Sequence, residues 1–159
     1  MDPYLYFFFL KKKTKKSGAL LALGLVTAGV RNEVDPAFAL LSDFVNDPKL
    51  VIKNSAIMGL GLAYAGSMRE DVLEILLPIV GNTGLGMELS SLTALALGHV
   101  FVASCHPEIT STILETLMER DPKVLKDPFA RFLGLGLALL YLGIKFDSFF
   151  LFFSFSVIF

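Results

Sequence analysis

The sequence has a single cysteine, Cys105, and only two histidines, His99 and His106, among its 159 residues. One cysteine cannot form an internal disulfide, and such a chain is typical of a reducing compartment. A structural zinc site needs four ligands at characteristic spacing, and no second cysteine is present to contribute. We therefore expect a buried Cys105 thiol, histidines at helix ends or packing surfaces, and neither metal nor cofactor.

The sequence also lacks the motifs of common enzyme classes. No base and orienting group accompany Cys105 as they would a catalytic nucleophile. The glycine pairs at 59/61 and 134/136 lie inside apolar helical segments, whereas a dinucleotide-binding loop links a strand to a helix. The glycine-rich segment GNTGLG at 81–86 has no Lys-Ser/Thr after it, so it is not a phosphate loop. We expect a protein that is not an enzyme.

Basic residues are scarce over most of the chain. The formal net charge is −1, but five of the 14 basic residues are concentrated in KKKTKK at 11–16. Residues 17–143 carry 8 Lys and Arg against 13 Asp and Glu, a net charge of −5. Nucleic acid binding requires a basic face, so an acidic body excludes nucleic acid and favours a basic partner.

The two ends differ in composition from this body. Ten of the 15 Phe residues lie in 1–16 and 144–159. Near the start, the charges follow the apolar run, whereas a secretory signal places them before it. The last 14 residues are fewer than the roughly 20 apolar residues that cross a bilayer. We interpret 1–16 as an atypical Phe/Lys-rich end and 144–159 as a low-complexity end foreign to the body.

Between these ends, one sequence pattern recurs. GALLALGLVTAG at 18–29, SAIMGLGLAYAG at 55–66 and LTALALGHVFVA at 92–103 follow one another at steps of 37 residues. A fourth copy, GLALLYLG at 136–143, matches 59–66 in five of eight positions. A period of 35–40 residues with two helices per unit is typical of a stacked helical solenoid. We predict an all-α domain over 17–143, with repeats starting near 17, 54, 91 and 129.

Each repeat begins with a segment that is apolar on nearly every face, such as 17–30 or 54–66. Such helices are buried between neighbours, and small residues let the backbones approach closely. We expect this packing role for Gly24, Gly61, Gly98 and Gly136. Gly29, Gly66 and Gly143 are predicted to end inner helices in the left-handed conformation, where the third copy has Ala103 instead.

The second helix of each repeat is amphipathic and begins after a short polar turn. Asp35-Pro36 has the pattern of an N-cap followed by proline at the first helical position. Glu70-Asp71 and Pro107-Glu108 place acidic residues at the next two starts. The segments NDPKLVIKN, GNTGLGME and RDPKVLKDP are predicted to be polar linkers.

The second helix of the third repeat, 108–119, carries an acidic stripe. At 100° per residue, Glu108, Thr112, Glu115 and Glu119 fall within roughly 60° of one another. The opposite face holds the apolar residues expected to pack inward, namely Ile109, Ile113, Leu114 and Leu117. An ordinary solvated helix face has the same pattern. The stripe is nevertheless the surface of this chain best suited to a basic partner.

The segments GLGLAYAG, REDVL and TSTILET resemble proteasome/cyclosome repeats over essentially the whole of 17–143. Within that family they look most like the large non-ATPase branch of the proteasome regulatory-particle base. The resemblance implies an arc of a toroid with inner and outer helices. It also implies a non-catalytic scaffold in cytoplasm and nucleus that docks ubiquitin and ubiquitin-like domains beside the ATPase ring.

The resemblance further implies that one docking surface of the family falls on Glu108, Glu115 and Glu119, with Thr112 beside them. Another acidic position of that surface falls on Gly84, although Glu88 is close. The Phe-rich end replaces the outer helix that would follow Gly143.

Three functions remain open on this sequence: a ubiquitin-docking scaffold, a repeat scaffold that contacts only other subunits, and a small membrane protein that uses its hydrophobic ends.

Overall fold

The computed structural model describes residues 3–30 and 35–143, and these contain helices and turns but no strand. The predicted all-α class is therefore confirmed. The helices, in chain order, are α1 (Pro3–Val26), α2 (Pro36–Ser42), α3 (Leu50–Ala63), α4 (Glu70–Gly81), α5 (Met87–Val100), α6 (Pro107–Glu119) and α7 (Arg131–Leu140). Two short 3-10 turns, η1 (Val124–Lys126) and η2 (Pro128–Ala130), precede α7.

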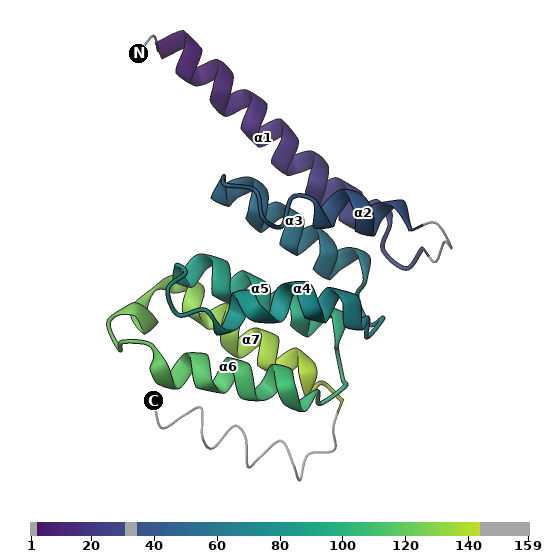
Figure 1. Ribbon diagram of the computed structural model, residues 1–159, viewed down its shortest axis with the longest axis vertical. Coiled ribbons are helices and arrows are strands. Elements are labelled where there is room, and N and C mark those ends of the chain that lie inside the picture. The colour runs from purple at the N-terminus through teal and green to yellow at the C-terminus, as the bar shows by residue number, and fades with distance from the viewer. Residues whose placement is uncertain (1–2, 31–34, 144–159) are drawn as a thin grey trace.

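The helices form a solenoid with an inner layer and an outer layer that pack against each other (Figure 1). In the inner layer α1 packs on α3, α3 on α5, and α5 on α7. In the outer layer α2 packs on α3, and α4 on α5, while α6 lies against both α4 and α7. The core between the layers is largely apolar, with Ile57, Leu60, Leu76, Leu97 and Ile113 each 0% exposed. The repeats therefore contribute most of the surface of α3 and α5, but only one side of each outer helix, to a continuous core.

Inner helices approach each other closely where both present small residues. A Cβ atom added at Gly24 would lie 2.4 Å from the carbonyl oxygen of Gly59. One added at Gly98 would lie 2.6 Å from the carbonyl oxygen of Gly136, and one at Gly61 would lie 2.8 Å from Cα of Ala96. Backbone atoms occupy these positions, so even a methyl group would force the helices apart.

The turns after α3 and α5 also cap the next inner helix. The N–H groups of Gly66 and Met68 donate to the carbonyls of His99 (2.9 Å) and Val100 (3.1 Å) at the end of α5. One repeat later, Ala103 and Cys105 donate to Leu139 and Leu140 at the end of α7, both at 3.0 Å. Carbonyls that would otherwise lack partners at the helix ends are thus satisfied by the neighbouring repeat.

The predicted backbone conformation of these turns is confirmed. Gly29, Gly66 and Gly143 have φ of 74°, 70° and 83°. Ala103 takes the same left-handed conformation with φ of 60°, although it has a side chain. Asp35 caps α2 as predicted, accepting a hydrogen bond from the Phe38 N–H at 3.3 Å, with Pro36 at the first helical position.

Several helix boundaries differ from those predicted. Helix α1 begins at Pro3 and crosses residue 17 without a break, because no glycine or proline interrupts it before Gly18. Helix α3 begins at Leu50, inside the predicted NDPKLVIKN linker, and α5 begins at Met87, inside GNTGLGME. The third linker, RDPKVLKDP, contains η1 and the start of η2. In the NDPKLVIKN linker, helix α3 starts soon after Pro48, and the Lys49 N–H just before this start donates to Asp47 Oδ1 at 2.8 Å.

Within the described ranges, no helix combines the length and the apolar character that crossing a membrane requires. The Phe-rich end at 144–159 lies outside the described residues.

Candidate docking face on helix α6

Helix α6 packs against its neighbours through side chains along its buried side. Pro107 is the first helical residue and Glu108 lies in the first turn, as predicted for this start. An acidic residue there interacts favourably with the positive end of the helix dipole. Ile109 and Ile113 are 0% exposed and join the core. The Thr116 hydroxyl, also buried, lies 3.1 Å from the Val80 carbonyl oxygen of α4.

The outward side of α6 carries the predicted carboxylates. Glu108, Glu115 and Glu119 are all exposed. None of them forms an ion pair with another residue in the described part of the chain. Thr112 is half-buried at the edge of this face, and its hydroxyl donates to the Glu108 carbonyl at 2.8 Å. Its methyl group points towards Gly81 of α4, where an added Cβ would be 3.4 Å away.

The apolar side of α6 is narrower than predicted. Leu114, which we expected to pack inward, is 37% exposed, and Met118 is 85% exposed. The buried arc instead includes Thr116, because its hydroxyl hydrogen-bonds to Val80 and Thr112 rather than to water. Leu114 and Met118 are one helical turn apart, and both lie on the same side of Glu115 around the helix axis. We call Glu108, Leu114, Glu115, Met118 and Glu119 the docking face.

Arg120, which the sequence gave no reason to single out, holds the end of α6 in place. It is only 8% exposed. Its Nη1 donates to the Leu85 carbonyl at 2.7 Å, and its Nη2 donates to Ser90 Oγ at 2.8 Å and to the Asn82 carbonyl at 3.2 Å. The arginine therefore ties the α6 end to the α4–α5 linker and to α5. An arginine at the end of an amphipathic helix is usually exposed, and its partners here lie 30 to 38 residues away in sequence.

The two other positions of the implied surface lie in this linker and just after it. Gly84 is exposed in the turn after α4, where its N–H donates to Asn82 Oδ1 at 3.0 Å. Glu88 is half-buried in the first turn of α5 and accepts a hydrogen bond from Asn54 Nδ2 at 2.7 Å. Glu88 thus bridges two inner helices.

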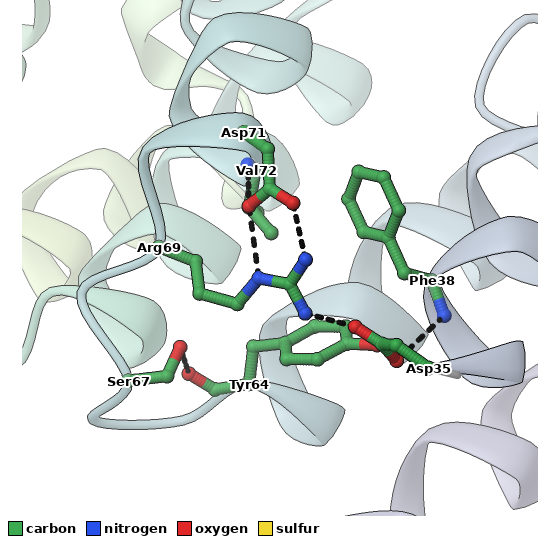
Figure 2. Close-up of polar contacts among 7 residues, drawn as sticks. All are labelled: Asp35, Phe38, Tyr64, Ser67, Arg69, Asp71 and Val72. Carbon is green, nitrogen blue, oxygen red and sulfur yellow. Dashed lines mark hydrogen bonds and ion pairs between the residues drawn. The ribbon is translucent and has the colours of Figure 1, made fainter. Parts of the chain in front are cut away.

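A polar cluster, separate from the docking face, joins α2, the end of α3 and the start of α4 (Figure 2). The Arg69 guanidinium pairs with Asp35 and Asp71, and the Tyr64 hydroxyl donates to Asp35. Arg69 also stacks over the rings of Phe38 and Tyr64, with Cζ 4.8 and 4.6 Å from their centroids. These contacts tie successive outer helices together.

The contacts in this cluster shift the pKa values of Asp35, Tyr64 and Arg69. Burial alone would raise the pKa of Asp35, but hydrogen bonds from Tyr64 and Arg69 outweigh it, so the pKa lies below its usual value. Burial and the hydrogen bond to Asp35 raise the pKa of Tyr64. The hydrogen bonds to Asp71 raise the pKa of Arg69. Asp35 and Arg69 are therefore both charged at neutral pH.

The cysteine and the histidines lie at helix ends and turns. Cys105 is half-buried in a left-handed turn with φ of 52°, not fully buried as predicted, because it lies between two helices. His106 occupies the N-cap position of α6, and its ring lies edge-on to Phe101 at 5.1 Å between centroids. His99 Nδ1 is 2.8 Å from the Leu95 carbonyl oxygen in α5. Over residues 3–30 and 35–143, no three His, Cys, Asp or Glu residues are grouped so that they could hold a metal ion.

Comparison with known proteins identifies the repeats. The proteasome/cyclosome repeat matches residues 18–53 and 55–88. The chain is 42% identical over 143 residues to "26S proteasome non-ATPase regulatory subunit 2" of Dictyostelium discoideum. It is 48% identical over 143 residues to "26S proteasome regulatory subunit rpn1" of Schizosaccharomyces pombe. The chain belongs to the proteasome/cyclosome-repeat family.

The matched relatives are much longer than this chain. Both alignments include 90% of this chain but only 16% of the relative, so the chain spans about one sixth of the length of these proteins. A plant relative, "26S proteasome non-ATPase regulatory subunit 2 homolog B" of Arabidopsis thaliana, is 42% identical over 127 residues, 80% of this chain and 14% of its own. The two matched proteasome/cyclosome repeats end at residue 88, before the docking face on α6.

Proposed function

We propose that this chain forms part of a non-catalytic scaffold of the proteasome regulatory particle, and that its docking face binds ubiquitin and ubiquitin-like domains. The first half of this proposal is supported by the match to the proteasome/cyclosome repeat and by the relatives, which are named as proteasome regulatory subunits. Its further partners would be other base subunits, including the ATPase ring, in cytoplasm and nucleus.

The second half is supported by the composition of the docking face. Three exposed carboxylates and two exposed apolar side chains lie on the same helix. Ubiquitin and its relatives present an apolar patch rimmed by Lys and Arg, which is complementary to this arrangement. Glu108, Glu115 and Glu119 would steer and orient the basic rim. Leu114 and Met118 would bury the apolar patch and contribute most of the affinity.

An NMR titration tests this proposal. Isotope-labelled ubiquitin or a ubiquitin-like domain is titrated with the full chain and with the Glu108→Lys/Glu115→Lys/Glu119→Lys variant. A matched control, Asp43→Lys/Glu70→Lys/Glu74→Lys, changes the net charge equally at exposed positions of other outer helices. Circular dichroism checks that all three proteins are helical.

We expect shifts on the apolar patch and basic rim with the wild type and the control, and none with the docking-face variant. Leu114→Ala/Met118→Ala is expected to weaken binding by about tenfold or more through lost apolar burial. Equal loss in the control would indicate a non-specific charge effect. Absence of shifts from the folded wild type would leave the scaffold function without ubiquitin docking at this face.

A further inference from the structure

The outer helices α4 and α6 end without the backbone hydrogen bond that closes the inner helices α3, α5 and α7. Each of those inner helices is followed by a residue whose N–H donates to a carbonyl of the last turn. After α4 and α6 the equivalent residues are Asn82 and Arg120, and neither N–H group forms such a bond within the described part of the chain. The last turn of such a helix frays unless other groups hold it in place.

The Arg120 side chain joins these two helix ends. It reaches from the end of α6 to the Asn82 carbonyl just after α4, and also to Leu85 and Ser90. No carboxylate pairs with Arg120 in the described residues, so two carbonyls and a hydroxyl compensate its buried charge. A cation is also stabilised at helix C-terminal ends. The planar guanidinium reaches three fixed acceptors at once, which the single ammonium of a lysine cannot do.

The contacts between α6 and the end of α4 lie directly beside the docking carboxylates. The Thr116 hydroxyl is 3.1 Å from the Val80 carbonyl oxygen, and Arg120 makes the next contact one helical turn later. These two residues directly follow Glu115 and Glu119, each 100° further around the helix axis. Only the Arg120 contact lies beyond Glu119, so it is the one that holds the last turn from both sides.

We propose that Arg120 is a positioning residue for the docking face, because it orders the last turn of α6 and thereby fixes where Glu119 meets a basic partner. This inference rests on the proposed docking of ubiquitin and ubiquitin-like domains at this face. The side chain of Arg120 is buried, so it would act through Glu119 and not by touching the partner. A carboxylate on a frayed turn has to be ordered when the partner binds, and this ordering reduces the affinity.

The direction of the effect separates positioning from a simple charge effect. Arg120→Met removes a positive charge beside an acidic face, so charge alone would make a basic partner bind more tightly. Positioning predicts weaker binding instead. Arg120→Lys keeps the charge but loses the planar fork, and it should weaken binding as well. We expect about fivefold weaker binding for either variant, and no greater loss than Glu119→Gln causes.

A double-mutant cycle tests whether Arg120 acts through Glu119. The affinity for isotope-labelled ubiquitin is measured by NMR titration for Arg120→Lys in the wild-type, Glu119→Gln and Glu108→Gln chains. We expect a loss of less than about twofold in the Glu119→Gln chain. In the Glu108→Gln chain, which is altered at the opposite end of α6, the full loss of about fivefold should remain. Equal losses in both chains, or tighter binding by Arg120→Lys, would overturn the inference.

Two further variants control for stability. Tyr64→Phe removes a hydrogen bond to Asp35 in the polar cluster away from the docking face, and it should change the docking affinity by less than about twofold. A loss as large as that in Arg120→Lys would assign the effect to general destabilisation. Ser90→Ala removes one acceptor of Arg120 at a position that is 0% exposed, so a smaller loss is expected. If Arg120→Lys does not fold, Ser90→Ala takes its place in the cycle.

Hydrogen exchange of the free chain gives a readout that does not depend on ubiquitin. In Arg120→Lys, the amides of residues 117–119 should exchange about tenfold faster or more, together with the Leu85 amide that donates to the Asn82 carbonyl. The amides of α2 should not change. Wild-type protection of 117–119 in this variant would refute the inference whatever the docking result. A wild type that binds no ubiquitin would refute the proposed function, and the exchange rates would then decide whether Arg120 positions this turn.

Discussion

Ala103 holds a left-handed backbone conformation in a turn whose equivalents all have glycine. Its φ is 60°, and its N–H donates to the Leu139 carbonyl at 3.0 Å, so the conformation is needed for the cap on α7. A residue with a Cβ loses about 1–2 kcal/mol in this region relative to glycine.

Ala103→Gly is therefore expected to raise the free energy of unfolding by about 1 kcal/mol, measured by urea denaturation. Ala65→Gly, in the turn after α3 but without a positive φ, serves as the control and should give no gain. Equal effects of the two substitutions would show that the strain at Ala103 is not significant.

Asp35 makes the stability of the chain depend on pH. Its pKa is lowered in the folded protein, because the hydrogen bonds from Tyr64 and Arg69 outweigh the effect of burial. A lowered pKa means that the stabilisation is fully present above the unfolded value of about 3.9 and is lost as the pH falls through the folded value.

We expect the free energy of unfolding to decrease below about pH 4, and Asp35→Asn to make this decrease shallower. Urea titrations at a series of pH values measure both slopes. Asp43→Asn, at an exposed position, controls for the loss of one carboxylate. An unchanged slope in Asp35→Asn would assign the acid sensitivity to other groups.

At the scale of the helices, a substitution of an inner-layer glycine is costly where backbone atoms of the next helix, rather than a side chain, lie opposite it. A Cβ at Gly98 would lie 2.6 Å from the Gly136 carbonyl oxygen, whereas one at Gly134 has nothing within 4 Å. Both glycines lie in helices, where alanine is better than glycine by about 1 kcal/mol.

Gly98→Ala is expected to lower the free energy of unfolding by about 1–3 kcal/mol through overpacking, and Gly134→Ala to raise it by up to about 1 kcal/mol. Thermal or urea denaturation of the pair decides this directly. A stabilised Gly98→Ala protein would mean that α5 and α7 separate at little cost.

The elements also show what sequence reasoning can and cannot reach. Periodicity and turn chemistry are local signals, so they predicted an all-helical chain, the Asp35 cap and the left-handed glycines. The start of α3 was missed because the Asp47 side chain, rather than a residue at the cap, supports it. Leu114 and Arg120 could not be placed, because their exposure depends on α4 and on the α4–α5 linker, more than 30 residues away.

At the scale of the whole molecule, the main contacts within residues 3–30 and 35–143 join each repeat to its neighbours. In the described residues, α1 packs on α2 and α3, whereas α7 packs on α5, α6 and η2. The energetics of such a solenoid are approximately the sum of the intrinsic stability of each repeat and the interfaces between neighbours. Damage at one end should therefore stay near that end, so that the two ends open separately.

Two matched substitutions at opposite ends test this separation. Gly136→Val places a side chain where an added Cβ is already 2.5 Å from the Ala94 carbonyl oxygen, and Gly24→Val does so 2.4 Å from that of Gly59. By hydrogen exchange, Gly136→Val should lose protection in α7 and α6 while α3 keeps it, and Gly24→Val should lose it in α1 and α2 while α6 keeps it. Loss of protection along the whole chain in either variant would show one cooperative unit. Local loss would instead allow the α6 docking face to survive disruption of the N-terminal repeat.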